Sequence, residues 1–209
     1  MAIKAIDIVL VPPKEIQVLC FAVNKAAAKV AKSRFEFGQN DYVPHITLIL
    51  GCVEETSIPK IQKLLQQLVV DYSVLDLELS GFGLYEKLNV QKKAYFQIEL
   101  NDKLLALHTK VAEIVRPYLL PCKDASVLVE GEKTGISESS SRFLNNFLKD
   151  YAFENYHAHI SLGCFDFEEK EMLLENISLP IKFKASTVSI YQIGDGCTCR
   201  EELYSVQLE

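Results

Sequence analysis

The chain has 209 residues, of which 28 are acidic and 22 basic, and its formal net charge is −6 at pH 7. This acidic balance argues against a broad nucleic-acid surface, which must neutralise many phosphates, but it allows a small nucleotide or one RNA end in a local pocket. The sequence holds no apolar run of about 18 residues that would span a membrane, and its first residues lack the features of a secretory signal. We therefore expect a cytoplasmic protein with no membrane partner.

Hydrophobic periodicity predicts strands and helices separated by turn residues. The predicted strands are residues 3–11, 42–53, 74–84, 94–100, 156–165, 183–193 and 198–208. The predicted helices are residues 15–33, 57–71, 101–117, 139–148 and 168–176. No linker rich in Pro, Gly or Ser divides the chain. We expect one domain over residues 1–209, with an α+β fold of two similar lobes, antiparallel sheets, flanking helices and a central cleft.

Residues 121–137 carry the weakest pattern. Residues 125–129 fit a short strand, and the remainder fits a loop. The stretch is either a lid that selects substrates or a surface connection without a binding role. The second interpretation is favoured, because loops often vary without binding anything.

One phrase occurs twice in the sequence, as YVPHITLILGC at residues 42–52 and as YHAHISLGC at residues 156–164. Both copies reduce to Tyr-x-x-His-Ile-hydroxyl-Leu, closely followed by Gly-Cys. Their histidines, His45 and His159, are 114 residues apart. Two copies in a chain of this length indicate two halves that bring the same chemistry to one site.

The alternation within each copy predicts which side chains share a face. Successive side chains of a strand point to opposite faces of the sheet. His45 and Thr47 therefore share one face, as do His159 and Ser161, while the isoleucine and leucine residues of each motif face the core. The apolar run at residues 48–50 predicts that the first of these strands is central and covered on both faces.

Two opposed histidines can act as the base and the acid of one reaction, because imidazole gains and loses a proton near neutral pH. The hydroxyls of Thr47 and Ser161 can donate hydrogen bonds to phosphate oxygens as negative charge develops on them. The opening of a cyclic phosphate is the simplest such reaction, since the leaving oxygen stays tethered and needs only a proton. This chemistry requires no metal ion and no other cofactor.

At these residues the sequence resembles the 2H phosphoesterase superfamily, also called the LigT-like or 2′–5′ RNA ligase-like group. The signature of that group is a pair of His-hydrophobic-Thr/Ser-hydrophobic motifs, and residues 45–48 and 159–162 match it in full. Pro44 agrees with the common form of the first motif, whereas Ala158 stands where the second motif often has proline. Residues 194–200, GDGCTCR, are loosely similar to the ending of some members.

The resemblance implies catalytic roles for His45 and His159 and phosphate-binding roles for Thr47 and Ser161. It implies a metal-independent phosphodiesterase that acts on a cyclic nucleotide, an RNA-end cyclic phosphate or a 2′–5′ linked oligonucleotide. Two alternatives stay open: a non-hydrolytic module that binds a nucleotide or RNA end in the same cleft, and a 2′–5′ RNA ligase. Both histidines and both hydroxyls are retained, which favours the enzyme. We expect a monomer whose partner is a small nucleotide or RNA-end substrate.

The remaining candidate residues receive structural interpretations. His108 and Arg200 are interpreted as structural or surface residues, and His157 as a structural or rim residue. Unless Pro44 marks a bulge, strict alternation places Tyr42 and Tyr156 on the face opposite the histidines, as packing residues. The six cysteines are scattered through the chain, so we interpret most of them as buried free thiols rather than as a disulfide framework.

Overall fold

The computed structural model describes residues 2–31, 37, 42–86, 92–130, 136–165 and 177–209. The helices are α1 (Lys14–Val30), α2 (Ile58–Val69), α3 (Asp102–Val115) and α4 (Glu138–Asp150). The strands are β1 (Ile3–Val11), β2 (Ile46–Glu54), β3 (Leu75–Glu86), β4 (Lys92–Ile98), β5 (His159–Phe165), β6 (Ile181–Ala185), β7 (Thr187–Gly194) and β8 (Thr198–Gln207). The predicted helix at residues 168–176 lies outside the described residues.

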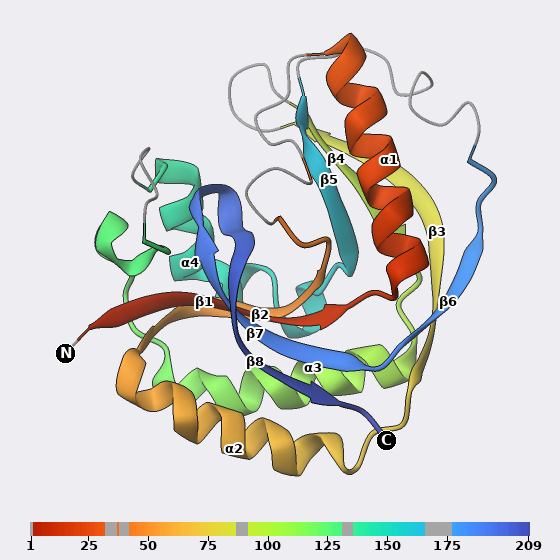
Figure 1. The fold of residues 1–209 in the computed structure, drawn as a ribbon. Helices are drawn as coiled ribbons and strands as arrows, with labels where there is room; N and C mark the ends of the chain where they lie inside the picture. The colour runs from red at the N-terminus through yellow and green to blue at the C-terminus, as the bar shows by residue number, and fades with distance from the viewer. Residues whose placement is uncertain (1, 32–36, 38–41, 87–91, 131–135, 166–176) are drawn as a thin grey trace.

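The described strands join into one curled sheet in the order β6-β3-β4-β5-β2-β1-β7-β8, and neighbouring strands are antiparallel (Figure 1). The sheet has two four-stranded halves, β2-β1-β7-β8 and β5-β4-β3-β6, which meet where β2 lies beside β5. Ile46 and Ile160 are the paired residues at this join. The predicted α+β class, with antiparallel strands and two similar halves, is confirmed.

The helices cover the two halves of the sheet unequally. Helix α1 packs on β5, whereas α3 and α4 pack on β2, and α2 lies beside α3 and β8 (Figure 1). This cover explains why β1 is buried without interruption from Ala5 to Leu10 and β2 from Leu48 to Val53. The prediction that the first motif strand is central is therefore confirmed.

The predicted strand at residues 183–193 is wrong as a single element. Strand β6 ends at Ala185 and β7 begins at Thr187, and the two lie at positions 1 and 7 of the sheet order. The chain thus passes from one half to the other at Ser186. The apolar alternation changes phase there, from Phe183 and Ala185 to Val188 and Ile190, and this shift is the local sign of the crossing that we missed.

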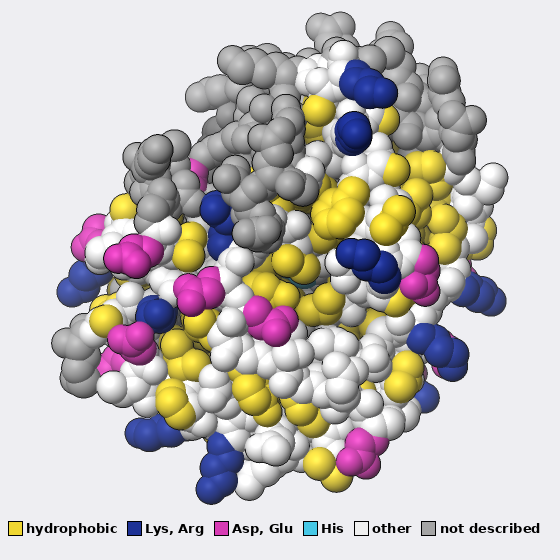
Figure 2. All heavy atoms as spheres, viewed as in Figure 1, with side chains coloured by type: hydrophobic (Ala, Val, Ile, Leu, Met, Phe, Trp, Pro, Cys, Tyr) yellow, Lys and Arg dark blue, Asp and Glu magenta, His cyan; other side chains and the backbone are white. Residues whose placement is uncertain are grey.

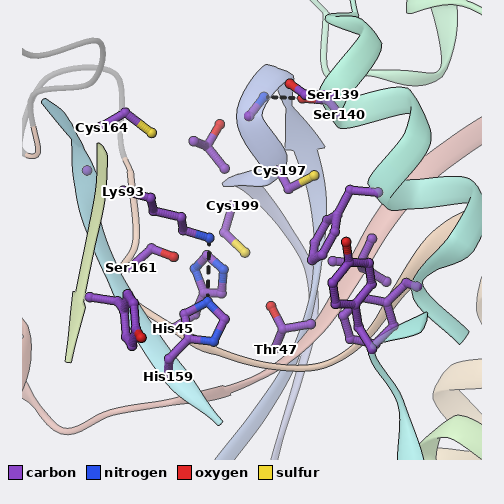
Figure 3. A pocket seen from close by; sticks show the side chains of 18 of the residues that line it. His45, Thr47, Lys93, Ser139, Ser140, His159, Ser161, Cys164, Cys197 and Cys199 are labelled. Carbon is purple, nitrogen blue, oxygen red and sulfur yellow. Dashed lines mark hydrogen bonds between the residues drawn. The ribbon is translucent and has the colours of Figure 1, made fainter. Parts of the chain in front are cut away.

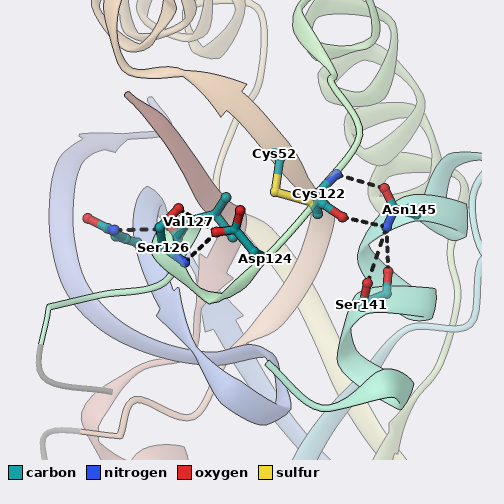
Figure 4. Close-up of a disulfide and its surroundings, with 8 residues drawn as sticks. Cys52, Cys122, Asp124, Ser126, Val127, Ser141 and Asn145 are labelled. Carbon is teal, nitrogen blue, oxygen red and sulfur yellow. Dashed lines mark hydrogen bonds between the residues drawn. A yellow bond between two sulfur atoms is a disulfide. The ribbon is translucent and has the colours of Figure 1, made fainter. Parts of the chain in front are cut away.

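Two cysteines that we interpreted as free thiols form a disulfide, Cys52–Cys122 (Figure 4). The bond ties β2 to the segment after α3. The amide of Cys122 donates to Oδ1 of Asn145 at 2.8 Å, and Nδ2 of Asn145 donates to the carbonyl of Cys122 at 3.1 Å. Because Asn145 belongs to α4, the disulfide and this amide pair anchor α4 to the central strand.

The described part of residues 121–137 contains a 3₁₀ turn at Ala125–Val127, so the short strand predicted at residues 125–129 is wrong. Asp124 caps this turn by accepting a hydrogen bond from the amide of Ser126 at 2.9 Å. Val127 and Leu128 are buried in the core. None of residues 121–130 lines the cavity that holds the two predicted histidines, which supports the interpretation as a connection.

No described helix has the length and apolar character needed to cross a membrane. Figure 2 shows lysine and arginine side chains scattered among acidic ones on the face that it presents. The described residues of that face form no single-sign patch of the kind that tracks a nucleic-acid backbone.

Candidate active site

Both predicted histidines lie at the start of a central strand. His45 directly precedes β2, and His159 is the first residue of β5. In each ring, Nδ1 is close to the carbonyl oxygen two residues earlier, at 2.7 Å from Val43 and 2.9 Å from His157. A carbonyl oxygen only accepts, so this bond assigns the hydrogen to Nδ1. The other nitrogen, Nε2, is then the atom that can take or give a proton.

A cavity of about 600 Å³ lies where the central strands, α4 and the β7–β8 turn come together (Figure 3). His45, Thr47, His159 and Ser161 all line it, so the structure brings the four predicted site residues to one place. Their chemical roles stay a prediction. The cavity also has an aromatic lining, which consists of Phe37, Tyr42, Tyr95, Phe143, Phe147, Tyr151 and Tyr156.

Asp7 of β1 is fully buried beside the first motif. The hydroxyl of Thr47 donates to Oδ2 of Asp7 at 2.9 Å, and Nε2 of His45 lies 3.5 Å from the same oxygen. Burial raises the pKa of the Asp7 carboxyl well above its usual value, against the opposing effects of the Thr47 hydrogen bond and the charge of Lys93. Thr47, the predicted phosphate ligand, is thus already engaged by a carboxylate.

Lys93 of β4 lies beside the second motif. Its Nζ is 3.4 Å from Nε2 of His159, and its side chain lines the cavity (Figure 3). The hydroxyl of Ser161, unlike that of Thr47, makes no hydrogen bond to any residue that the structure describes. The second motif therefore offers a cation and a hydroxyl to a ligand, while the first holds its hydroxyl on Asp7.

Both histidines are neutral at pH 7 in this structure. Burial lowers the pKa of His45 to about 4, and Lys93 acts in the same direction. Burial, followed by the charge of Lys93, lowers the pKa of His159 to about 3. A bound phosphate would raise both values, because a nearby negative charge favours the imidazolium form.

The β7–β8 turn brings two cysteines to the cavity wall. Cys197 and Cys199 both line the cavity, and neither forms a disulfide. Figure 3 shows the sulfur of Cys199 pointing toward the ring of His45. Three possible metal ligands also meet here. They are one donor atom each on Asp7, His45 and Cys199, which lie within 4.8 Å of one another, so these residues could hold a metal ion.

His108 is a structural residue, as predicted. It is fully buried, its Nδ1 lies 2.7 Å from the carbonyl oxygen of Leu48, and its Nε2 accepts a hydrogen bond from the amide of Phe153 at 2.9 Å. Tyr156 stacks on this ring with centroids 3.7 Å apart and donates its hydroxyl to the carbonyl of Thr47 at 2.9 Å. The second motif therefore supports the backbone of the first.

The two motif tyrosines do not lie on the face opposite the histidines. Tyr42 and Tyr156 line the same cavity as His45 and His159, because they precede the strands and strict alternation does not apply to them. Arg200, which we interpreted as an exposed charge, is half-buried with its guanidinium 4.9 Å from the ring centre of Tyr42. His157 is exposed at the cavity edge, which agrees with a rim residue.

A family model of the 2′-5′ RNA ligase superfamily matches residues 21–196. The chain belongs to the 2′-5′ RNA ligase superfamily. The resemblance to 2H phosphoesterases is thereby confirmed, and the chemistry of this superfamily concerns phosphodiester bonds. Among curated proteins, none matches the sequence significantly.

Solved structures support the fold of this superfamily member. The protein TT0787 of Thermus thermophilus is 12% identical with a TM-score of 0.58, and 98% of this chain and 97% of that chain are covered. Escherichia coli LigT complexed with NADP+ is 13% identical with a TM-score of 0.53 and coverages of 99% and 98%. LigT complexed with 3′-AMP, also 13% identical, has a TM-score of 0.50 and coverages of 99% and 98%. At these identities the likeness shows the fold alone.

Sequence analysis missed the residues that this superfamily member places beside its motifs. Asp7 interrupts an apolar strand, and a lone carboxylate inside a buried strand is the signal that could have marked it. Lys93 lies between the strands predicted at residues 74–84 and 94–100, and nothing local links it to His159. Cys199 was considered only among the scattered cysteines. Each becomes visible once the order of strands is known.

Proposed function

We propose that this chain is a metal-independent phosphodiesterase that acts on a cyclic nucleotide, an RNA-end cyclic phosphate or a 2′–5′ linked oligonucleotide, with His45 and His159 as acid and base. The observation that carries the proposal is the matched pair of Nδ1–carbonyl bonds. They leave two Nε2 atoms available in one cavity. A binding module would need neither a proton donor nor a proton acceptor.

The reaction follows from these groups. One imidazole takes a proton from water, and the water oxygen forms a bond to phosphorus. The bond from phosphorus to the leaving oxygen breaks, and the other imidazole, in its protonated form, gives its proton to that oxygen. Lys93 and the hydroxyl of Ser161 stabilise the charge on the non-bridging oxygens, because both are donors at the second motif.

The size and lining of the cavity support a small substrate. A volume of about 600 Å³ lies within the range of small-molecule sites. Aromatic rings on its walls suit the flat faces of nucleobases. LigT, which shares the fold, has been crystallised with 3′-AMP and with NADP+. A monomer, a single domain over residues 1–209 and a cytoplasmic location go with this proposal.

The test is incubation of the purified protein in EDTA with 2′,3′-cyclic nucleotides, 3′,5′-cyclic nucleotides, ADP-ribose cyclic phosphate and 2′–5′ linked oligoadenylate. We expect turnover of at least one substrate, and a loss of about 100-fold or more in each of His45→Ala and His159→Ala, because each removes a proton-transfer partner. His157→Ala, an exposed neighbour at the rim, is the matched control and should keep most of the rate.

Three results would contradict the proposal. Tight binding of a nucleotide without turnover would identify a binding module. Activity that needs a metal ion, or that survives in both histidine variants, would place the chemistry elsewhere. Joining of RNA ends without hydrolysis of any substrate would identify the ligase alternative.

A further inference from the structure

Three side chains from three strands converge beside the first motif. Asp7 comes from β1, His45 directly precedes β2, and Cys199 comes from β8. They bring one oxygen, one nitrogen and one sulfur donor within 4.8 Å of one another. Asp7 and Cys199 are 0% and 1% exposed, so these donors meet in the protein interior at the cavity wall.

The donor set suits a particular class of ion. Thiolate, imidazole and carboxylate are the three ligand types of Zn²⁺, whereas Mg²⁺ and Ca²⁺ prefer oxygen alone. Three protein ligands leave a fourth tetrahedral position, which here would face the cavity. Ligands on such an ion are about 3.5 Å apart for bonds of 2.0–2.3 Å, so small side-chain rotations would close the present separations.

The second observation is the state of the Asp7 carboxylate. Oδ2 accepts a hydrogen bond from Thr47, but Oδ1 is buried and has no hydrogen-bond partner among the described residues. A buried side-chain oxygen without a partner is rare and requires an explanation, which a bound ion would provide. Lys93 lies with its Nζ 3.4 Å from Nε2 of His159, and its charge also acts on Asp7.

His45 is already oriented as a metal ligand. Its Nδ1 hydrogen is held by the carbonyl of Val43 at 2.7 Å, and this backbone bond fixes the ring so that Nε2 faces Asp7. Metal-binding histidines commonly donate their second nitrogen in this way. His159 has the same backbone bond, but its Nε2 faces the ammonium of Lys93, which repels a cation.

We propose that Asp7, His45 and Cys199 bind a thiophilic divalent cation of the Zn²⁺ class, and that this ion inhibits the protein. The thiol of Cys199 gives its proton to solvent when the metal–sulfur bond forms. Binding occupies Nε2 of His45, so the ring can no longer transfer a proton. The inhibition rests on the proposed function, whereas the binding of the ion does not.

The test uses Co²⁺ as a spectroscopic probe and calorimetry with Zn²⁺, on protein freed of metal with EDTA and then dialysed. We expect one Co²⁺ per chain and a near-ultraviolet thiolate-to-cobalt absorption band. Cys199→Ser should abolish the band, and Cys199→Ser and Asp7→Asn should each weaken Zn²⁺ binding at least tenfold. Cys197→Ser is the matched control, because Cys197 lines the same cavity two residues away, and it should keep both signals. Circular dichroism checks that each variant is folded.

The outcomes separate this inference from the proposed function. A band that depends on Cys199 supports the ion site even if no substrate is turned over. If a substrate is found, micromolar Zn²⁺ should slow its turnover in the wild type, and EDTA should restore it. No saturable binding, or equal binding by Cys199→Ser and the wild type, would overturn the ion site and leave the phosphodiesterase proposal intact.

Discussion

Asp7 and Lys93 occupy equivalent positions in the two halves of the sheet. Asp7 pairs with Leu50, five residues after His45, and Lys93 pairs with Cys164, five residues after His159. Both registers shift at the same place, where the leucine of the motif is passed over. The two halves thus share their backbone geometry down to a β-bulge, yet one places an acidic side chain and the other a basic one beside its histidine.

This difference between the neighbours of the two histidines predicts that His159 is the base. Burial and, after it, the ammonium group of Lys93 disfavour the imidazolium form of His159, so this ring stays neutral and able to accept a proton. Lys93→Met should raise the pKa of His159 and move the acidic limb of the kcat/KM profile to higher pH. It should also raise KM about tenfold or more, because a phosphate-binding cation is lost. The measurement is kcat and KM across pH 4–9.

Lys92→Met provides the control for this prediction. Lys92 is the neighbouring lysine of β4 but does not line the cavity. Its loss should leave the pH profile in place. Equal profiles for Lys93→Met and the wild type would mean that Lys93 does not set the protonation of His159.

Loss of the Thr47 hydroxyl and loss of the Ser161 hydroxyl should have different effects on stability. Thr47→Val removes the donor to buried Oδ2 of Asp7, and a buried acceptor left unsatisfied costs about 1–3 kcal/mol. Ser161→Ala removes a hydroxyl without a partner among the described residues, so the free energy of unfolding should change by roughly 0.5 kcal/mol or less, while turnover falls. Urea unfolding and rate measurements on both variants check this. Equal losses of stability would contradict the difference that we infer.

Acid should unfold the protein through its buried histidines. The folded pKa values are about 4 for His45 and about 3 for His159, against about 6.5 in the unfolded chain. Between these values the unfolded state binds more protons, so the free energy of unfolding falls as pH drops below about 6.5. The raised pKa of Asp7 acts in the opposite sense, since the folded state then holds its proton more firmly.

Thermal unfolding from pH 7.5 to pH 4 measures this dependence. The double variant His45→Gln/His159→Gln should show a flatter curve. The double variant should keep the part of the pH dependence that is due to His108, because burial also lowers the pKa of His108. A curve as steep as that of the wild type would assign the acid sensitivity to other groups.

Reduction of the disulfide should weaken both the fold and the cavity wall. Cys52 and Cys122 are 70 residues apart, and closing a loop of this length is worth on the order of 4 kcal/mol in the chain-entropy estimate. The double variant Cys52→Ser/Cys122→Ser should therefore lose stability. It should also raise KM more than it lowers kcat, since α4 carries Phe143 and Phe147 of the wall. Reductant should change the wild type similarly and leave the double variant unaffected.

Local pattern predicted most strands and helices, because alternation and helical periodicity are properties of consecutive residues. It failed at Ser186, where β6 and β7 are both extended but pair with different strands. The four motif residues were found because the phrase is repeated. Asp7 and Lys93 were missed because their role depends on β1 lying beside β2 and β4 beside β5. The Cys52–Cys122 pairing likewise depends on tertiary neighbours, which spacing alone does not give.

The order of the strands has a consequence for how the chain assembles during synthesis. Strand β1 lies between β2 and β7, and β7 spans Thr187–Gly194, so one partner of β1 is made only after β2 to β6. The other half of the sheet, β3 to β6, comes from one continuous stretch, residues 75–185. On the ribosome, β1 must therefore wait for β7 with an apolar edge that chaperones can recognise.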